Sequence, residues 1–380
     1  MRTTSPIPLS LYIHFPWCVR KCPYCDFNSH TALDPLPEDA YRIALIQDLE
    51  AALPLIHGRP VISLFIGGGT PSLITPSCLD RLMMDIRTRV NILPKAEITL
   101  EANPGTFEVA RFADFHMAGV TRLSMGIQSF NNAHLKALGR IHSAQDAWQA
   151  AQSARQIFDN VNLDLMYGLP NQTATQAAED LATALACEPT HLSCYQLTIE
   201  PNTAFATAPP PLPEADACAD IQEMLEKELA KAGFEHYEVS AFARPGERCQ
   251  HNLNYWLFGD YLGIGAGAHS KLTCNNSIVR QMRWKHPQTY LEKVATGQFI
   301  QTEHTVTPEQ LPGEFMMNAL RLRDGFHPDL FFDRTGLAIE TQGVTLQAAT
   351  SKGLLVNTPQ NIRPTPQGMR FLNPLLEMFL

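Results

Sequence analysis

Residues 12–27 read YIHFPWCVRKCPYCDF, and three of them are cysteines with C-x3-C-x2-C spacing. Cys18, Cys22 and Cys25 follow an apolar run, residues 11–15, that predicts a β-strand. Cysteine thiolates are soft ligands that suit zinc or an iron–sulfur cluster. Three cysteines on a [4Fe–4S] cluster leave one iron open, and that iron can bind a further molecule. The spacing therefore indicates a metal centre directly after the first strand.

A zinc site is the alternative to the cluster. Structural zinc takes four protein ligands, and Asp26, His30 or a distant histidine could complete the set. The choice between cluster and zinc depends on the motifs in the rest of the chain.

The composition limits the class of protein. The chain has 380 residues, of which 45% are hydrophobic and 18% charged, so it can bury a large core and suggests one large domain with a smaller one. Its net charge is −9, and no basic block is present. Binding to nucleic acid therefore has no electrostatic support.

The cysteine pattern and the lack of apolar segments point to a compartment. The nine cysteines are odd in number and scattered, unlike the framework of a secreted disulfide-rich protein. Residues 1–10 lack the apolar segment of a secretory signal. No apolar run is long enough to span a bilayer. We therefore expect a cytoplasmic protein.

Strand-like and helix-like segments alternate along the first two thirds of the chain. The predicted strands cover residues 11–15, 61–66, 97–100, 122–127, 161–166 and 191–197. The predicted helices cover residues 38–53, 77–90, 108–118, 144–158, 174–187 and 214–232. This alternation predicts an α/β fold with a parallel sheet and crossover helices. Six units favour a partial (β/α)6 TIM-like barrel, and a doubly wound open sheet is the alternative.

Polar or glycine-rich residues follow nearly every predicted strand. They are GGGTP at 67–71, EANP at 101–104, Gln128 with Ser129, YGLP at 167–170 with Asp164 before it, and TIEP at 198–201. In barrels of this kind the carboxyl ends of the strands form the site. We therefore expect these residues and the cysteine loop to share one rim.

The pattern changes after about residue 237. Residues 238–242 predict a last strand, and residues 261–269 are glycine-rich and predict a turn region. After residue 285 we expect a small, mostly helical domain. Its winged-helix-like end would be a helix over 347–352 followed by strands over 353–356 and 362–365. The predicted domains are thus residues 1–285 and 286–380.

The rim residues suggest the chemistry of a ligand. Glycines let the backbone approach a ligand closely, and the run at 67–71 lacks the spacing of a phosphate loop or a dinucleotide fold. Glu101 could bind ribose hydroxyls or an amine, and Arg140 offers a fork for a carboxylate. Together with Gln128 and Asp164, these residues indicate a site for a small, polar, zwitterionic nucleoside.

Motifs along almost the whole chain resemble the HemN/HemW branch of the radical SAM superfamily. They are LYIHFPWCVRKCPYCDF, FIGGGTPS, EANPGT, GIQSF, LGRIH, NLDLMYGLP, LTIEPNT and HNLNYW. The resemblance implies a [4Fe–4S] cluster on Cys18, Cys22 and Cys25, with S-adenosylmethionine on its open iron. It implies contacts to S-adenosylmethionine from Tyr12, Tyr24, Gly68, Gly69, Thr70, Glu101, Gln128, Arg140 and Asp164. The oxidase of the branch binds two such molecules, and the number for this chain stays open.

The branch contains an oxygen-independent coproporphyrinogen III dehydrogenase and a haem chaperone. The dehydrogenase carries a further cysteine two residues past the cluster motif, where this chain has Phe27. The dehydrogenase also has a sizeable segment before the first strand, whereas about ten residues precede Leu11 here. Residues 251–256, HNLNYW, match the HNxxYW motif associated with the chaperone. The resemblance thus implies a chaperone without oxidase activity, and the dehydrogenase is the alternative.

The HNLNYW stretch is the predicted haem contact. Histidine nitrogen is a common ligand of haem iron, and Tyr255 and Trp256 could stack on a flat macrocycle. We therefore expect His251 to contact haem. The implied partners are haem and recipient apo-haemoproteins, without nucleic acid, and with peripheral association at the inner face of a respiratory membrane.

Overall fold

A twelve-stranded mixed sheet forms the centre of the computed structural model, which describes residues 7–274 and 277–380. The order of its strands is β14-β13-β12-β11-β1-β4-β5-β6-β7-β8-β10-β9. Residues 1–6, which belong to the stretch searched above for a secretory signal, lie outside the described residues.

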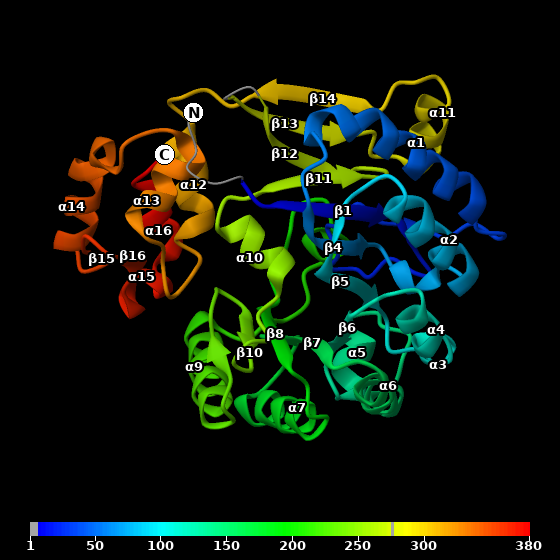
Figure 1. The fold of residues 1–380 in the computed structure, drawn as a ribbon. Coiled ribbons are helices and arrows are strands. Elements are labelled where there is room, and N and C mark those ends of the chain that lie inside the picture. The colour runs from blue at the N-terminus through cyan, green and yellow to red at the C-terminus, as the bar shows by residue number, and fades with distance from the viewer. Residues whose placement is uncertain (1–6, 275–276) are drawn as a thin grey trace.

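The six strands of the predicted alternation lie side by side and run parallel. They are β1 (Leu9–Phe15), β4 (Val61–Gly68), β5 (Ile92–Ala102), β6 (Arg122–Gln128), β7 (Asn160–Tyr167) and β8 (His191–Gln196). The helices that follow these strands are α1 (Glu38–Ile56), α2 (Pro76–Arg87), α4 (Phe112–Met117), α6 (Ala144–Ile157), α7 (Ala174–Ala186) and α9 (Ala215–Lys231). Figure 1 shows these helices around the outside of the curved sheet. The prediction of a partial six-unit barrel is confirmed.

Local signals explain where the helices begin. Ser143 and Asp146 form a capping box at the start of α6, and Thr173 and Gln176 form another at the start of α7. Such caps satisfy backbone N–H groups that have no partner inside the helix.

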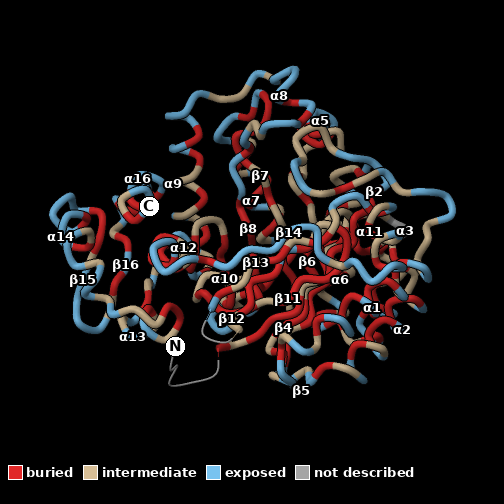
Figure 2. The backbone as a smooth tube through the Cα atoms, turned by 90° about the horizontal axis from the view of Figure 1, so that it is seen from above, coloured by how far each residue is buried: buried red, intermediate tan, exposed pale blue. Residues whose placement is uncertain are grey.

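The strands bury apolar side chains between the sheet and these helices. One leucine on each of the six strands is at most 1% exposed: Leu11, Leu64, Leu100, Leu123, Leu163 and Leu192. Each such burial contributes about 1.5–3 kcal/mol of transfer free energy. Figure 2 shows the buried backbone concentrated in the central strands, around β4, β6 and β11.

The predicted turn at residues 261–269 is wrong, because its first part is a strand. β11 (Asp260–Ile264) pairs in parallel with β1, with Leu9 opposite Asp260. Buried Leu262 and Ile264 hold this strand in the core, and Gly265 turns the chain after it with a φ of +100°. The glycines therefore mark the end of a seventh parallel strand.

The strand predicted at 238–242 is displaced. The structure has β9 (Glu235–His236) and β10 (Ala241–Ala243), and β10 runs antiparallel to β8 at one edge of the sheet. At the other edge β12 (His269–Cys274), β13 (Ser277–Arg283) and β14 (Ile300–Thr305) add an antiparallel meander. The sheet thus continues through residue 305, past the division expected between residues 285 and 286.

A second, smaller core lies beside the barrel and contains the rings of Phe315, Phe326 and Phe331. Its elements are α12 (Leu311–Ala319), α13 (Pro328–Thr335), α14 (Gly343–Ser351), β15 (Leu355–Asn357), β16 (Ile362–Pro364), α15 (Pro366–Arg370) and α16 (Leu372–Glu377). The strands β15 and β16 pair antiparallel directly after α14, as the predicted helix and wing require.

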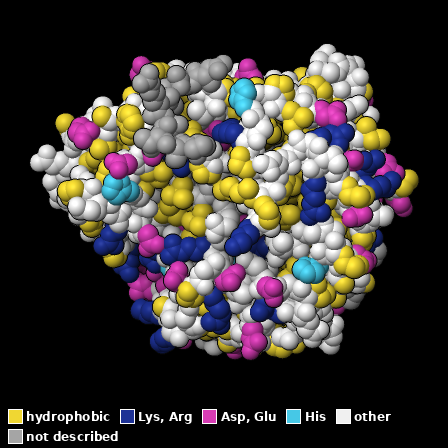
Figure 3. Space-filling model, viewed as in Figure 1, with side chains coloured by type: hydrophobic (Ala, Val, Ile, Leu, Met, Phe, Trp, Pro, Cys, Tyr) yellow, Lys and Arg dark blue, Asp and Glu magenta, His cyan; other side chains and the backbone are white. Residues whose placement is uncertain are grey.

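Short elements complete the fold. They are β2 (Trp17–Cys18), β3 (His30–Thr31), α3 (Thr106–Val109), α5 (Asn132–Ala137), α8 (Ala204–Thr207), α10 (Gln250–Trp256), α11 (Pro287–Val294) and the 3-10 turns Pro71–Leu73 and Ile339–Gln342. Acidic side chains lie among the basic ones on the face in Figure 3. Across the described part of the chain, no helix combines the length and the apolar character needed to cross a membrane.

Candidate cluster and nucleoside site

The cysteine loop is held against the glycine turn that follows β4. The Gly69 amide donates to the Phe15 carbonyl at 2.7 Å, and the Thr70 amide donates to the Trp17 carbonyl at 2.7 Å. Cys18 is buried at the end of β2, and burial raises the pKa of its thiol. The backbone of Cys25 donates to the carbonyl of Cys22 at 3.1 Å, which closes a tight turn between these two half-buried cysteines.

The three cysteines of the loop are the predicted metal ligands. Among the described residues, no group of three or more His, Cys, Asp or Glu side chains is arranged to hold one metal ion. A cubane cluster binds each cysteine at a different iron, so its ligands stand further apart than those of one ion. All three thiols nevertheless line one cavity. Three thiols on one cavity are a donor set that fits a [4Fe–4S] cluster, and the choice between cluster and zinc stays a prediction.

This cavity, which we call the rim cavity, has a volume of about 360 Å³ and lies at the carboxyl ends of the parallel strands. Every predicted site residue except Tyr12 and His251 lines it: Cys18, Cys22, Cys25, Tyr24, Gly68, Gly69, Thr70, Glu101, Gln128, Arg140 and Asp164. The expected convergence on one rim is thus seen in the structure, although the ligand remains a prediction.

Two half-buried carboxyl groups, those of Glu101 and Asp164, line the rim cavity. A Glu101 carboxylate oxygen accepts the Gly68 amide at 3.0 Å, and an Asp164 oxygen accepts the Asn162 side-chain amide at 2.8 Å. Burial raises the pKa of Glu101 to about 8, and Asp164 nearby adds to the rise. Burial also raises the pKa of Asp164. A cationic or hydroxyl-bearing ligand would therefore interact favourably with both carboxyl groups.

Two arginines, Arg20 and Arg140, line the rim cavity, and Arg140 makes contacts to both sides of it. One of its nitrogens donates to the Asn103 side chain at 2.7 Å and to the Gly126 carbonyl at 2.8 Å. The other lies 3.7 Å from the sulfur of Cys22. Arg140 thus connects the cysteine loop to the strand ends.

Asn103 was expected on the rim as part of EANP but was given no role, and Ser124 and Tyr195 are among the lining residues that the sequence did not single out. Ser124 had a usable signal, because Arg122, Ser124, Gly126 and Gln128 alternate along β6 and alternate residues of a strand share a face. Asn103 stood in a quoted motif, and its amide donates to the Thr70 hydroxyl at 3.0 Å.

Tyr12 and His251 line a separate cavity of about 250 Å³, which we call the inner cavity. Glu101 and Asp164 line both this inner cavity and the rim cavity. The Tyr12 hydroxyl lies 3.0 Å from Nδ1 of His14. Tyr12 therefore adjoins the carboxyl groups without lining the rim cavity.

His251 does not offer a free nitrogen for haem iron. It is 1% exposed, its Nδ1 lies 3.0 Å from the Ser63 hydroxyl, and its Nε2 lies 3.1 Å from the Tyr255 hydroxyl. Burial lowers the pKa of His251 to about 3, so the ring is neutral. Both nitrogens are engaged by neighbours from β4 and α10, and a direct contact between His251 and haem stays a prediction.

Gly69 marks the closest approach of the glycine turn to the cysteine loop. A Cβ at Gly69 would lie 2.5 Å from the Trp17 carbonyl oxygen and 2.8 Å from its carbon. These backbone atoms of β2 cannot rotate away. We expect Gly69→Ala to lower the free energy of unfolding by about 1–3 kcal/mol in urea titrations. In Gly343→Ala the new Cβ meets nothing within 4 Å, so this control should match wild type. Equal stability of the two variants would contradict the steric argument.

Glu101 should make stability depend on pH. Its folded-state pKa of about 8 exceeds its unfolded value, so the folded chain keeps a proton that the unfolded chain releases. The stabilisation is present below the unfolded pKa and is lost as pH rises toward 8. The free energy of unfolding of Glu101→Gln, relative to that of wild type, should therefore rise by about 1.4 kcal/mol per pH unit between pH 5 and 7.5. Urea unfolding across this range measures the difference. If the unfolding free energies of Glu101→Gln and wild type changed with pH in parallel, the prediction would be refuted. Glu214→Gln, at an exposed position, is the control.

Comparison with known proteins identifies the family. The sequence model of the radical SAM superfamily matches residues 12–184, and that of the HemN C-terminal domain matches residues 306–371. The Escherichia coli protein named heme chaperone HemW is 46% identical over 375 residues, 98% of each chain. The Haemophilus influenzae protein of the same name is 47% identical over 379 residues, again 98% of each chain.

A solved structure agrees with this assignment. The coproporphyrinogen III oxidase HemN of Escherichia coli, described as a radical SAM enzyme, superposes with a TM-score of 0.84 at 25% identity. The match covers 98% of this chain and 90% of that one. HemN therefore shares the fold at lower identity than the HemW proteins, and this chain belongs to the HemW family of the radical SAM superfamily.

Proposed function

We propose that this protein is a haem chaperone that binds a [4Fe–4S] cluster, S-adenosylmethionine and haem, and delivers haem to apo-haemoproteins. The observation that carries the proposal is the 46% identity, over 98% of both chains, to a protein named heme chaperone HemW. We place this activity in the cytoplasm, with peripheral contact at the inner face of a respiratory membrane.

The residues of the rim cavity fit the two family cofactors. Cys18, Cys22 and Cys25 would hold the cluster, which when bound supplies one open iron to a further ligand. The carboxyl groups of Glu101 and Asp164 suit the amine and the ribose hydroxyls of S-adenosylmethionine. Arg140, on the cysteine-loop side, suits its carboxylate.

Replacing either carboxyl group tests this placement. Glu101→Ala and Asp164→Ala should each weaken binding of S-adenosylmethionine by roughly 1–3 kcal/mol, because each removes a buried polar partner. Equilibrium dialysis of the cluster-loaded protein measures the loss. The control is Asp216→Ala, an exposed residue of α9. Unchanged affinity in both rim variants would contradict the shared rim.

Coproporphyrinogen III oxidation is the second candidate, favoured by the superposition on HemN. The position that carries a further cysteine in the oxidase holds Phe27 here, and this ring is 63% exposed where it lines the rim cavity. Radical decarboxylation needs a site that excludes water. An exposed ring beside the cluster does not provide such a closure, so the chaperone is the stronger proposal.

Two measurements on anaerobic, cluster-loaded protein decide between the candidates. Added haem should change the absorbance in the Soret region, and apomyoglobin added afterwards should take up that haem. Coproporphyrinogen III with S-adenosylmethionine and a reductant should give no product. Catalytic turnover would overturn the chaperone proposal, and so would a failure to bind haem.

A further inference from the structure

The largest of the three cavities described here lies between the barrel and the C-terminal helices. We call it the side cavity; its volume is about 500 Å³, within the usual range for sites of organic ligands. Its walls come from β1, β11, β12, β13, the end of α10 and α12. Phe27, Gly68 and Glu101 line both the side cavity and the rim cavity. A ligand in the side cavity would therefore lie next to the cluster site.

The walls of the side cavity are rich in aromatic rings: Tyr12, Phe27, Tyr255, Trp256, Phe258 and Tyr261. The rings of Tyr255 and Tyr261 are held edge to face, with centroids 4.4 Å apart. Rings fixed in this way offer flat apolar surface to a flat ligand. The size and the lining together fit a conjugated macrocycle.

Trp256 adds an unused hydrogen-bond donor to the lining. Its Nε1 is buried and has no acceptor among the described residues. Buried donors without a partner are rare in folded proteins and need an explanation. A carboxylate on a bound ligand would supply the missing acceptor.

From this lining we propose that haem binds in the side cavity with His269 as an axial ligand of its iron. The proposal rests on the haem-binding function proposed above. It adds where haem binds and which residue binds its iron, neither of which the proposed function specifies.

Three histidines adjoin the side and inner cavities, and only His269 is available. Nδ1 of His14 lies 3.0 Å from the Tyr12 hydroxyl, and its Nε2 lies 2.8 Å from the Asn28 carbonyl. His251 is engaged at both nitrogens. His269 begins β12, is exposed and lines the side cavity, and its ring makes no hydrogen bond to any described residue.

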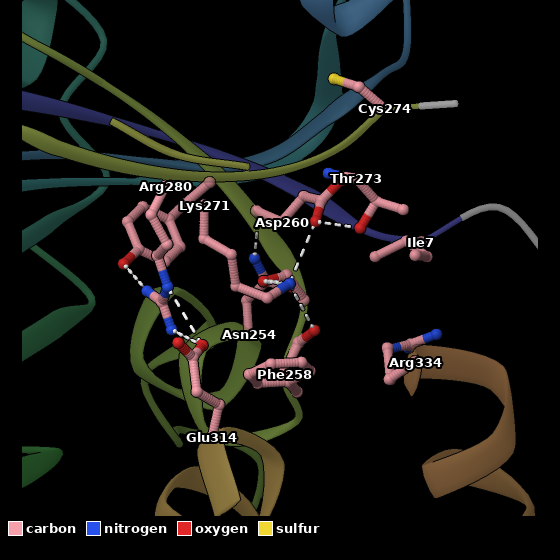
Figure 4. A network of polar contacts seen from close by, with 12 residues as sticks. Ile7, Asn254, Phe258, Asp260, Lys271, Thr273, Cys274, Arg280, Glu314 and Arg334 are labelled. Carbon is pink, nitrogen blue, oxygen red and sulfur yellow. Dashed lines mark hydrogen bonds and ion pairs between the residues drawn. The ribbon is translucent and has the colours of Figure 1, made fainter. Parts of the chain in front are cut away.

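The charges around His269 agree with this role. Burial, then Lys285 and Arg280, lower the pKa of His269, which favours the neutral form of the ring that can bind iron. The same two cations suit the propionates of haem. Arg280 already forms an ion pair with Glu314 of α12 at 2.6 Å and donates to the Tyr261 hydroxyl at 2.9 Å (Figure 4). A propionate would share this guanidinium with Glu314.

His251 keeps an indirect part in the binding. Its Nε2 bonds to the hydroxyl of Tyr255, whose ring lines the side cavity. His251 is thus a positioning residue for the cavity wall.

Titration of ferric haem into the full-length protein tests the proposal. His269→Ala should weaken the affinity by at least roughly tenfold to a hundredfold, the range for losing only a hydrogen-bond partner of a metal ligand. It should also shift the Soret band, and free imidazole should restore the band. Trp256→Phe should weaken binding roughly fivefold with the band unmoved, because one hydrogen bond is lost. His304→Ala on exposed β14 is the control.

The outcomes separate the two proposals. If wild type binds no haem, the proposed function fails, and the side-cavity proposal fails with it. If wild type binds haem while His269→Ala keeps the same affinity and spectrum, only the side-cavity proposal fails. A moved Soret band in His251→Ala with an unmoved band in His269→Ala would assign the iron to His251. Weaker binding in His251→Ala with the band unmoved supports the positioning role.

Discussion

Cys22→Ser is expected to abolish the brown colour of the anaerobically purified protein and to remove its bound iron. Cys22 is one of three thiols on the rim cavity, and no other cysteine lines that cavity. A serine hydroxyl is a harder and weaker ligand for iron than a thiolate. The two remaining cysteines would not hold the proposed cluster, whose fourth iron has no protein ligand in the proposal. Iron and sulfide analysis, with the electron paramagnetic spectrum of the reduced protein, measures the loss.

Cys274→Ser is the matched control for this experiment. Cys274 is a partly buried free cysteine at the end of β12, and its thiol donates to the carbonyl of Leu55. The control should keep the full iron content of wild type. A Cys22→Ser variant with as much iron as the control would show that the cluster has other ligands.

The largest expected loss of stability follows Asp260→Asn. Asp260 is fully buried at the start of β11, where it pairs with Lys271 at 3.1 Å and with Arg59 at 2.8 Å. Burial would raise the pKa of this carboxyl, but the two cations hold it below its usual value. Figure 4 shows the same carboxylate accepting hydrogen bonds from Thr273. The amide would leave Lys271, itself 2% exposed, as a buried charge without a counterion.

Breaking a buried pair in this way costs about 3–5 kcal/mol, which urea unfolding of wild type and variant will measure. Exposed Asp329→Asn is the control. Adding Lys271→Met to Asp260→Asn should recover part of the loss, because the uncompensated charge is then gone. A loss below 1 kcal/mol in the single variant, or no recovery in the double variant, would contradict the buried-pair argument.

Some of the fold and of the site was determined by the sequence alone. The cysteine spacing, the period-two strands and the residues at the strand ends are local patterns, read over a few neighbouring residues. Parallel strands joined by right-handed crossovers have all their carboxyl ends on one side. For this reason the sequence alone predicts that Glu101, Asp164 and the cysteines lie on one rim.

Other features depend on residues that are far apart along the chain, and the tertiary structure alone decided them. Residues 261–269 look like a glycine-rich turn until β1 lies beside the first of them, because a parallel pair gains its hydrogen bonds only from the distant strand. His251 looks like a ligand in its motif, but Ser63, from β4, takes one of its nitrogens. His269 carries no motif at all. Its ring lines the cavity between the sheet, α10 and α12 and has no hydrogen-bond partner among the described residues. Whether a side chain lacks such a partner depends on the whole fold.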